Sequence, residues 1–321
     1  MPLRFRRTTG GGEGHREPDQ GSPDGNPNVS PQTGQTHRPE PPEGARHLVM
    51  VVLDSLRYDT CMAAGMANMQ RLGAVQRRWS YASWTAPSHY NLMMGLLPHA
   101  SPTRVYASEY YKADFLRYQE RLGVDGIEFK SLLPSIYLPT YLRGTLGYRT
   151  AAMVSMPVLN PHVPLNRDFD SYRLMPHHND LAAMVEELRF DGDRPWFYLL
   201  NTGETHYPYA LPGEDPAEWP RISGVHGVVK GLDGAGGGEE GAPGGDFFEP
   251  EQMEQLRARQ QRAAAYVDGV LGRLFDAAPP GTWIIVTSDH GELFGEGGMF
   301  GHGPVAHEKV FEVPFVEGTL R

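Results

Sequence analysis

Short, almost wholly apolar runs that end in acidic residues constrain the fold of this chain most. His47 to Leu53 reads HLVMVVL and is followed by Asp54, as expected of a strand that is buried on both faces. Thr282 to Ser288 is a second run, rich in β-branched and aromatic residues, and it leads directly into Asp289 and His290. Because strands buried on both faces occur in sheets that helices cover, these runs favour an α/β fold.

Helical segments alternate with the strands along the chain. We expect helices at residues 137–146, 181–188 and 252–275, and further strands at residues 149–155 and 196–200. Strand–helix alternation at this spacing predicts a largely parallel central sheet with helices on both faces. The length of 321 residues allows one large α/β domain or two small ones.

Two stretches have compositions that do not favour a packed core. Residues 1–45 are dominated by Gly, Pro, Gln, Glu and Arg and predict a disordered tail. Residues 221–246 are Gly-rich, and an irregular segment of this length is usually a lid or a disordered insertion. We therefore expect one catalytic domain over residues 46–321, interrupted by a flexible insertion at 221–246.

Charge and cysteine content exclude several classes of protein. The net charge of −10 argues against a nucleic-acid-binding surface, which would need a basic stripe. No apolar run approaches the roughly 18–20 residues that span a bilayer, so we expect no membrane span. Cys61 is the single cysteine and excludes an internal disulfide framework. We expect a cytoplasmic protein, and the sequence leaves its oligomeric state open.

Three of the expected strands end in groups that can bind a metal ion or a phosphate: Asp54, Glu204–His206 and Asp289–His290. Parallel strands bring their carboxyl ends to one edge of the sheet, where α/β proteins bind ligands. Carboxylates and imidazoles together suit a divalent cation such as Mn²⁺ or Zn²⁺. The competing interpretation is that Asp289 caps a helix and Gly291 permits a turn. Three convergent strand ends favour a shared site.

A hydroxyl nucleophile is available in Ser83–His89, which reads SWTAPSH and leads into a helix expected at residues 88–97. The N-terminus of a helix offers free N–H groups and a positive dipole end, and both favour a bound oxyanion. A capping hydroxyl with Pro87 in the first helical turn fits the same residues. One side chain can fill both roles.

The order of these motifs resembles the sulfatase branch of the alkaline phosphatase superfamily. The motifs are Asp54, TAPSH at 85–89, THYPY at 205–209 and SDHG at 288–291, and the likeness covers about residues 46–318. The resemblance implies an alkaline-phosphatase-like α/β fold. Since the sequence stops soon after the last core motif, we expect the C-terminal subdomain of this family to be missing.

By this resemblance, the chain is a metal-dependent hydrolase or transferase that acts on a small phosphate or sulfate ester. The resemblance implies one divalent metal ion, with Mn²⁺ favoured and Zn²⁺, Mg²⁺ and Ca²⁺ as alternatives. The implied metal ligands are Asp54, Thr85, Asp289 and His290. Thr85 would also attack the ester and form a covalent intermediate. His206 and His302 would bind the substrate oxyanion or protonate the leaving group.

Departures from the sulfatase pattern favour phosphate over sulfate. Sulfatases oxidise a Cys or Ser to formylglycine, and Thr85 cannot become that aldehyde. His89 replaces the Arg of the motif, and Arg167 resembles an arginine of the phosphoglycerol transferases, so we expect both to bind substrate. The resemblance therefore favours a phosphoesterase, phosphodiesterase or phosphoryl transferase. An arylsulfatase-like sulfuric ester hydrolase is one alternative. A non-catalytic sulfatase-fold binding protein is another, which Ser55 in place of a second Asp makes plausible.

Overall fold

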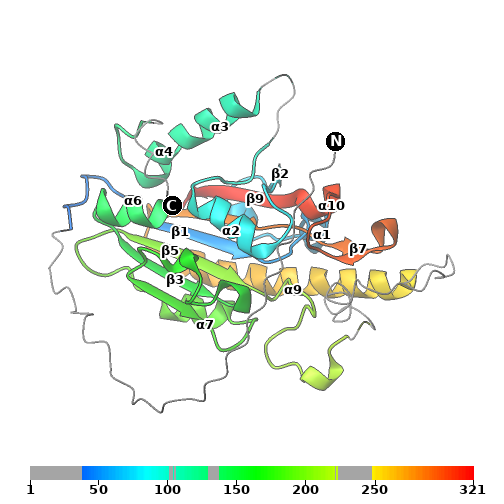
Figure 1. Cartoon of the computed structure of the whole chain (residues 1–321). Helices are drawn as coiled ribbons and strands as arrows, with labels where there is room; N and C mark the ends of the chain where they lie inside the picture. Colours follow the sequence, from blue (N-terminus) through cyan, green and yellow to red (C-terminus); the bar gives the residue numbers. More distant parts are fainter. Residues whose placement is uncertain (1–37, 101–103, 105, 129–136, 221, 223–247) are drawn as a thin grey trace, which may run out of the picture. The chain divides into compact units, whose positions relative to one another are not determined.

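Seven strands form the central sheet, in the order β2-β9-β6-β1-β5-β3-β4. The structure is a computed structural model that describes residues 38–100, 104, 106–128, 137–220, 222 and 248–321 (Figure 1). The strands of this sheet are β1 (Leu48–Leu53), β2 (Gln76–Trp79), β3 (Arg149–Val154), β4 (Ser171–Leu174), β5 (Trp196–Thr202), β6 (Trp283–Ser288) and β9 (Glu312–Thr319). Two short strands, β7 (Leu293–Phe294) and β8 (Phe300–Gly301), pair with each other.

The register around β1 determines where the polar strand ends meet. β1 pairs in parallel with β5 on one side and with β6 on the other, so that Leu53 lies opposite both Thr202 and Ser288. β3 and β4 continue the parallel order, whereas β9 runs antiparallel to β6. Since β1 and β6 end in register, Asp54 and Asp289 leave the sheet next to each other.

Helices cover both faces of the sheet. The α-helices are α1 (Tyr58–Ala64), α2 (Thr85–Met93), α3 (Ala107–Leu116), α4 (Tyr118–Leu122), α6 (Leu138–Gly144), α7 (Leu181–Glu187), α9 (Pro250–Ala277) and α10 (Glu308–Phe311). Short 3-10 helices are η1 (Met69–Leu72), η3 (Pro157–Leu159), η4 (Pro164–Asn166), η5 (Pro216–Glu218) and η6 (Glu296–Gly298). Together, the sheet and helices form the predicted α/β fold, and the fold class is confirmed.

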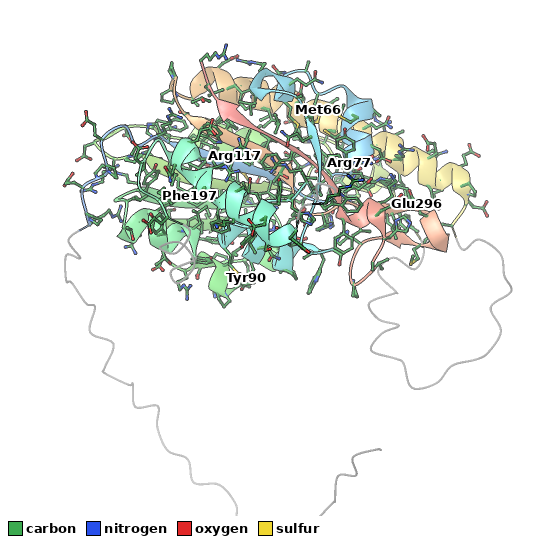
Figure 2. All side chains as sticks on the ribbon, turned by 90° about the horizontal axis from the view of Figure 1, so that it is seen from above. Met66, Arg77, Tyr90, Arg117, Phe197 and Glu296 are labelled. Atoms are coloured by element: carbon green, nitrogen blue, oxygen red, sulfur yellow. The ribbon has the colours of Figure 1, made fainter. Side chains whose placement is uncertain are left out.

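The alternation of side chains in β1 builds two cores. Residues 48, 50 and 52 join a core with α2, α3, α4 and α6, and residues 49, 51 and 53 join a core with α1, α7 and α9. Successive side chains of a strand point to opposite faces, which is why a run without polar residues is needed here. Figure 2 shows the molecule from above, relative to the view of Figure 1. Tyr90 of α2 and Phe197 of β5, which are labelled there, belong to the first core.

The long helix α9 packs its buried face against the sheet. Val267, Leu271 and Leu274 recur at the spacing of one helical face and are fully buried in the second core. The helix was expected at residues 252–275, and the observed bounds extend it by two residues at each end. Figure 1 shows α9 and α7 on one side of the sheet, opposite α2 and α3.

The helix that follows the nucleophile motif begins earlier than expected. It was expected over 88–97, but α2 spans Thr85–Met93, so that Thr85 is its first residue and Trp84 is its extended N-cap. Pro87 is tolerated there because the first helical turn needs no intrahelical N–H donor. Gly95 has a φ of 78°, a left-handed conformation that ends the helix before Leu97.

Arg38, the first described residue, lies before the expected domain boundary at residue 46 and makes specific contacts. Its Nη1 donates to the carbonyl oxygen of Tyr148 at 3.1 Å, and its Nη2 pairs with Asp170 Oδ1 at 2.5 Å. Residues 1–37 of the expected tail lie outside the described residues, as does the expected insertion apart from Ile222. Within the described part of the chain, no helix combines the length and the apolar character needed to cross a bilayer.

Candidate active site

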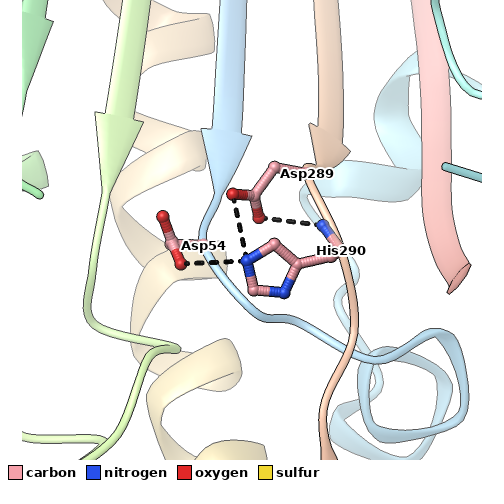
Figure 3. Close-up of side chains that lie close together, drawn as sticks. All are labelled: Asp54, Asp289 and His290. Carbon is pink, nitrogen blue, oxygen red and sulfur yellow. Dashed lines mark hydrogen bonds and ion pairs between the residues drawn. The ribbon is translucent and has the colours of Figure 1, made fainter. Parts of the chain in front are cut away.

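Two strand ends bring Asp54, Asp289 and His290 together. Figure 3 shows Asp54 directly after β1 and the other two residues directly after β6, with their side chains turned toward one another. One ligand atom from each residue lies within 4.8 Å of the other two. His290 Nε2 is 3.8 Å from Asp54 Oδ1 and 3.4 Å from Asp289 Oδ2. All three side chains are buried.

Neighbouring groups fix the two carboxylates. The backbone N–H of Ser55 donates to Asp289 Oδ1 at 3.2 Å, and the Ser55 hydroxyl donates to Asp54 Oδ1 at 3.1 Å. Asn201 of β5 donates from Nδ2 to Asp54 Oδ2 at 3.2 Å. Ser55 holds a φ of 63°, an uncommon value for a residue other than glycine. Backbone strain of this kind concentrates at functional sites, where the surroundings hold the conformation in place.

The imidazole of His290 presents a lone pair to the two carboxylates. Its Nδ1 donates to the carbonyl oxygen of Gly291 at 2.9 Å, and burial, together with the charge of His302, lowers the pKa of His290 well below its usual value. The ring is therefore neutral, and Nε2 carries no proton. Two carboxylates and a lone pair thus face one another at close range, an arrangement that needs a positive charge between them.

Asp289 gives independent support for a cation at this place. Its Oδ2 is buried and has no hydrogen-bond partner among the described residues. Burial and the nearby charge of Asp54 raise the pKa of Asp289 well above its usual value. A divalent cation would satisfy the unpartnered oxygen and offset the repulsion between the two carboxylates. Oxygen and imidazole ligands fit Mn²⁺ or Zn²⁺, and the residues present therefore fit the predicted metal.

Thr85 places its hydroxyl at this cluster from the first turn of α2. Thr85 Oγ1 lies 3.3 Å from His290 Nε2 and 3.5 Å from Asp54 Oδ1. The side chain is only 4% exposed, yet it lines a cavity of about 760 Å³. The hydroxyl of Thr85 therefore lies between the candidate metal ligands and the cavity, where it can contact an ester bound in that cavity.

His206 and His302 line the same cavity. Their ring centroids are 5.2 Å apart, and the ring of His302 lies 4.2 Å from that of His290. His302 Nδ1 donates to Glu292 Oε1 at 3.0 Å. Burial alone would lower the pKa of His302, but the hydrogen bond and charge of Glu292 outweigh it and raise that pKa. Glu292 thus favours the protonated form of His302 beside the cavity.

Two predicted substrate-binding residues lie elsewhere. His89 is fully buried and is not among the residues that line the cavity. Its Nδ1 donates to the carbonyl oxygen of Thr85 at 2.8 Å and lies 3.7 Å from Asp289 Oδ2. His89 thus contacts two of the candidate metal ligands without lining the cavity. Arg167 is largely exposed, pairs with Asp168 and lies over the ring of Tyr137 at 4.8 Å. The structure does not bring Arg167 to the cluster.

Sequence reasoning missed Glu292 and Asn201. Glu292 is buried and receives hydrogen bonds from His302 and from the hydroxyl of Tyr209, the latter at 2.5 Å. Its place directly after the Ser288–Gly291 motif was a signal for it. Asn201 lies inside β5, where an amide in an apolar strand was the available signal.

The fold and the site together define a class of protein. Its members have an alkaline-phosphatase-like α/β sheet with a carboxylate–imidazole cluster at the carboxyl edge. Residues 161–316 match the family model named Sulfatase. The motifs predicted this likeness to the sulfatases, and the family model matches the chain over these residues. The matched range contains His206, Asp289, His290 and His302, whereas Asp54 and Thr85 precede it.

Several solved structures are similar to this chain, all at low identity. The C-terminal periplasmic domain of EcEptC from Escherichia coli in complex with Zn is 13% identical with a TM-score of 0.49, over 87% of this chain and 74% of that chain. Phosphonate monoester hydrolase of Agrobacterium radiobacter is 18% identical with a TM-score of 0.48, over 85% and 68%. A 2-O GAG sulfatase is 11% identical with a TM-score of 0.46, over 86% and 65%. No curated protein sequence matches the chain.

Proposed function

We propose that this chain is a metal-dependent hydrolase or transferase of small phosphate or sulfate esters, with phosphate mono- or diesters favoured. The observation that carries the proposal is the position of Thr85 Oγ1, which lies 3.3 Å from His290 Nε2 and 3.5 Å from Asp54 Oδ1 and also faces the cavity. Asp54, Thr85, Asp289 and His290 would hold the metal ion. When bound, a divalent cation would lower the pKa of a ligating hydroxyl and polarise the ester oxygens.

Thr85 is the nucleophile in this proposal. Its Oγ1 loses its proton to solvent water and forms a bond to the phosphorus atom of the ester, and the bond from phosphorus to the leaving oxygen breaks. The result is a covalent ester on Thr85. Water or an acceptor alcohol then attacks the phosphorus atom and releases the threonine oxygen, and the choice between them decides hydrolase or transferase.

His302 is the proposed source of the proton for the leaving oxygen. Glu292 raises the pKa of this imidazole and orients it, because Nδ1 donates to Glu292 at 3.0 Å and Nε2 is left to donate to the leaving oxygen. His206, which donates from Nδ1 to the carbonyl oxygen of Tyr207 at 2.7 Å, has a fixed ring that can bind an oxyanion or share this role when it is protonated. Both rings border the cavity that Thr85 faces.

The chemistry of threonine favours phosphate over sulfate. Oxidation of a secondary alcohol cannot yield the aldehyde that sulfatases of this superfamily use, so that Thr85 itself must attack. A sulfuric ester hydrolase of arylsulfatase type, with the unmodified hydroxyl as nucleophile, is the second candidate. A binding protein without catalysis is the third, but it would have no need of the four clustered side chains that a metal-bound nucleophile requires.

A panel of esters tests the proposal. Purified protein with Mn²⁺ is assayed with aryl phosphate, phosphodiester, phosphonate and sulfate esters, before and after chelation. We expect turnover of a phosphate ester, its loss on chelation, and a loss of more than about 1,000-fold in Thr85→Ala. Thr60→Ala, which alters a buried threonine of α1 whose hydroxyl has no hydrogen-bond partner in the described part of the chain, is the matched control and should retain activity. Equal rates for wild type and Thr85→Ala would contradict the nucleophile.

The cellular setting follows the same proposal. We place the protein in the cytoplasm, with a small-molecule ester as its partner. The only cysteine, Cys61, is buried against the sulfur atoms of Met66 and Met69, and burial raises its pKa to about 12. A thiol of this kind is unreactive, as suits a packing residue. Fractionation of cells that express the full chain tests the location.

A further inference from the structure

The cavity in front of Thr85 is apolar over most of its lining. Its polar side chains, Thr85, His206 and His302, belong to the candidate site itself. The remaining lining side chains are Trp84, Met156, Pro157, Val158, Phe248, Leu293, Met299, Phe300, Pro304 and Val305, with three glycines between them. Among the described residues that line it, none is Asp, Glu, Lys or Arg, although 21% of the chain is charged.

Three distant segments supply this apolar wall. Trp84 immediately precedes the nucleophile and caps α2, Val158 lies in η3 after β3, and Met299 lies in the segment after β6. These three side chains are 46%, 41% and 37% exposed, so that apolar surface reaches the mouth of the cavity. Large exposed apolar groups that gather around a cavity mark a place where an apolar ligand binds.

Other aromatic rings hold part of the wall in place. The ring of Phe300 lies 5.6 Å from that of Tyr207, 5.9 Å from that of Phe248 and 6.1 Å from that of Phe294. Such a cluster restricts the rotation of Phe300, so this part of the wall is preorganised for a ligand. A volume of about 760 Å³ is enough for an aromatic ring with substituents.

The Glu292 carboxylate beside the cavity has no free acceptor for a cationic ligand. Both oxygens of the buried Glu292 carboxylate accept hydrogen bonds, one from His302 and one from Tyr209, so they offer no free acceptor to an ammonium group. A charged or heavily hydroxylated group placed among Trp84, Val158 and Met299 would lose its hydration without gaining a partner.

We propose that the ester taken by this site carries an uncharged, apolar organic group, aryl or branched alkyl, which lies against Trp84, Val158 and Met299. This inference rests on the proposed function for the reacting group, and it adds the class of alcohol or phenol that is esterified. The phosphate or sulfate end lies at Thr85, and the apolar end extends toward the mouth of the cavity.

An isosteric pair of ligands tests this inference without turnover. The full chain is loaded with Mn²⁺ and titrated calorimetrically with 3-tert-butylbenzylphosphonate and with 3-(trimethylammonio)benzylphosphonate, which differ in charge and hardly in shape. We expect the tert-butyl ligand to bind at least about 10-fold more tightly, because its apolar surface is removed from water at no cost in lost hydration of a charge. Equal affinities, or a preference for the ammonium ligand, would overturn the inference.

Substitutions in the apolar wall of the cavity test whether this wall causes the preference for the tert-butyl ligand. Trp84→Ala and Met299→Ala should each reduce the affinity ratio by about 3-fold or more, since each removes apolar contact area. Met94→Ala is the matched control, because Met94 is 42% exposed at the end of α2 but does not line the cavity. The ratio must stay unchanged in Met94→Ala. A ratio that none of the three substitutions alters would contradict a role for this wall.

Turnover separates this inference from the proposed function. The corresponding two aryl phosphates are assayed in parallel, and the tert-butyl ester should have the higher kcat/KM even though the ammonium group makes the better leaving group. Turnover of both esters at equal kcat/KM contradicts the apolar specificity and leaves the proposed function standing. Selective binding of the tert-butyl phosphonate without turnover of either ester contradicts the proposed function and supports the apolar site.

Discussion

The buried Glu292 and the partly exposed His302 form an acid–base pair at the edge of the cavity, with Nδ1 of His302 3.0 Å from Oε1 of Glu292. The hydroxyl of Tyr209 donates a hydrogen bond to Oε2 of the same Glu292 carboxylate. Glu292 thus raises the pKa of one imidazole that lines the cavity with Thr85, while burial lowers the pKa of a second, His290. Two histidines with opposite pKa shifts in one site are what a proton donor and a metal ligand require.

Removal of the Glu292 charge should lower the pKa of His302. In Glu292→Gln the hydrogen bond and charge that outweigh burial are lost, so the imidazole should deprotonate at lower pH. The pH at which activity falls on the basic side should move down with it. NMR titration of His302 and a pH–rate profile measure the two effects. Glu296→Gln, which alters a nearby carboxylate that pairs with Arg57 instead, should leave both unchanged.

The same pair makes stability depend on pH. The folded-state pKa of His302 is raised above its unfolded value, so its contribution is fully present below the unfolded pKa, near 6.5, and is lost as pH rises through the folded pKa. Glu292→Gln should therefore lower Tm more at pH 5.5 than at pH 8.5. Thermal unfolding of both proteins across this range measures it. A loss of Tm that is equal at both pH values would contradict the assigned pair.

The buried carboxylate of Asp289 should destabilise the metal-free protein. Asp289 has a raised pKa because of burial and Asp54, so its ionised form costs stability at neutral pH. Asp289→Asn should raise the Tm of the metal-free protein and abolish most of the further rise that Mn²⁺ produces in the wild type. Calorimetry with and without Mn²⁺ measures both. Asp276→Asn, an exposed acid of α9, is the control and should bind Mn²⁺ as the wild type does.

The left-handed backbone of Ser55 should tolerate glycine but not a β-branched residue. Its φ of 63° is accessible to Gly at little steric cost and is a genuine outlier for Val. We expect Ser55→Val to lose about 1–3 kcal/mol of unfolding free energy and Ser55→Gly to lose less. Denaturant unfolding measures both. Similar losses in the two variants would show that the hydroxyl bond to Asp54, and not the backbone, dominates.

The glycine after the metal ligands is required by a close backbone contact. A Cβ at Gly291 would lie 2.1 Å from the carbonyl oxygen of Lys309, so Gly291→Ala must displace the backbone beside His290. We expect a lower Tm and weaker Mn²⁺ binding. Gly269→Ala is the matched control, because a Cβ there in the exposed interior of α9 meets nothing within 4 Å. That variant should gain roughly 0.5–1 kcal/mol.

Sequence patterns predicted the sheet and the cluster because both depend on local periodicity and on chain direction. Apolar runs without polar interruptions identified β1 and β6, and parallel pairing then required Asp54 and Asp289 to meet. The start of α2 at Thr85 was predicted three residues late, since a proline in the first turn is compatible with either boundary.

The surroundings of the cluster could not be predicted in this way. The contact of Glu292 with His302 depends on the turn between β7 and β8, and no local pattern encodes it. The apolar cavity is assembled from segments that are distant in sequence, and Trp84, Val158 and Met299 are unremarkable when each is taken alone. Arg167 was expected at the substrate on motif likeness, but the loop after β3 directs it to Asp168.

Covalent trapping at Thr85 tests the central claim most directly. The Mn²⁺-loaded protein is mixed with an aryl phosphate, quenched in acid and digested, and the peptide that contains Thr85 is analysed by mass spectrometry. His302→Ala is included because slower proton transfer alters the fraction trapped. We predict a phosphoryl group on Thr85 in the wild type and none in Thr85→Ala. Turnover without any modified threonine, or with the label on another residue, would contradict the account.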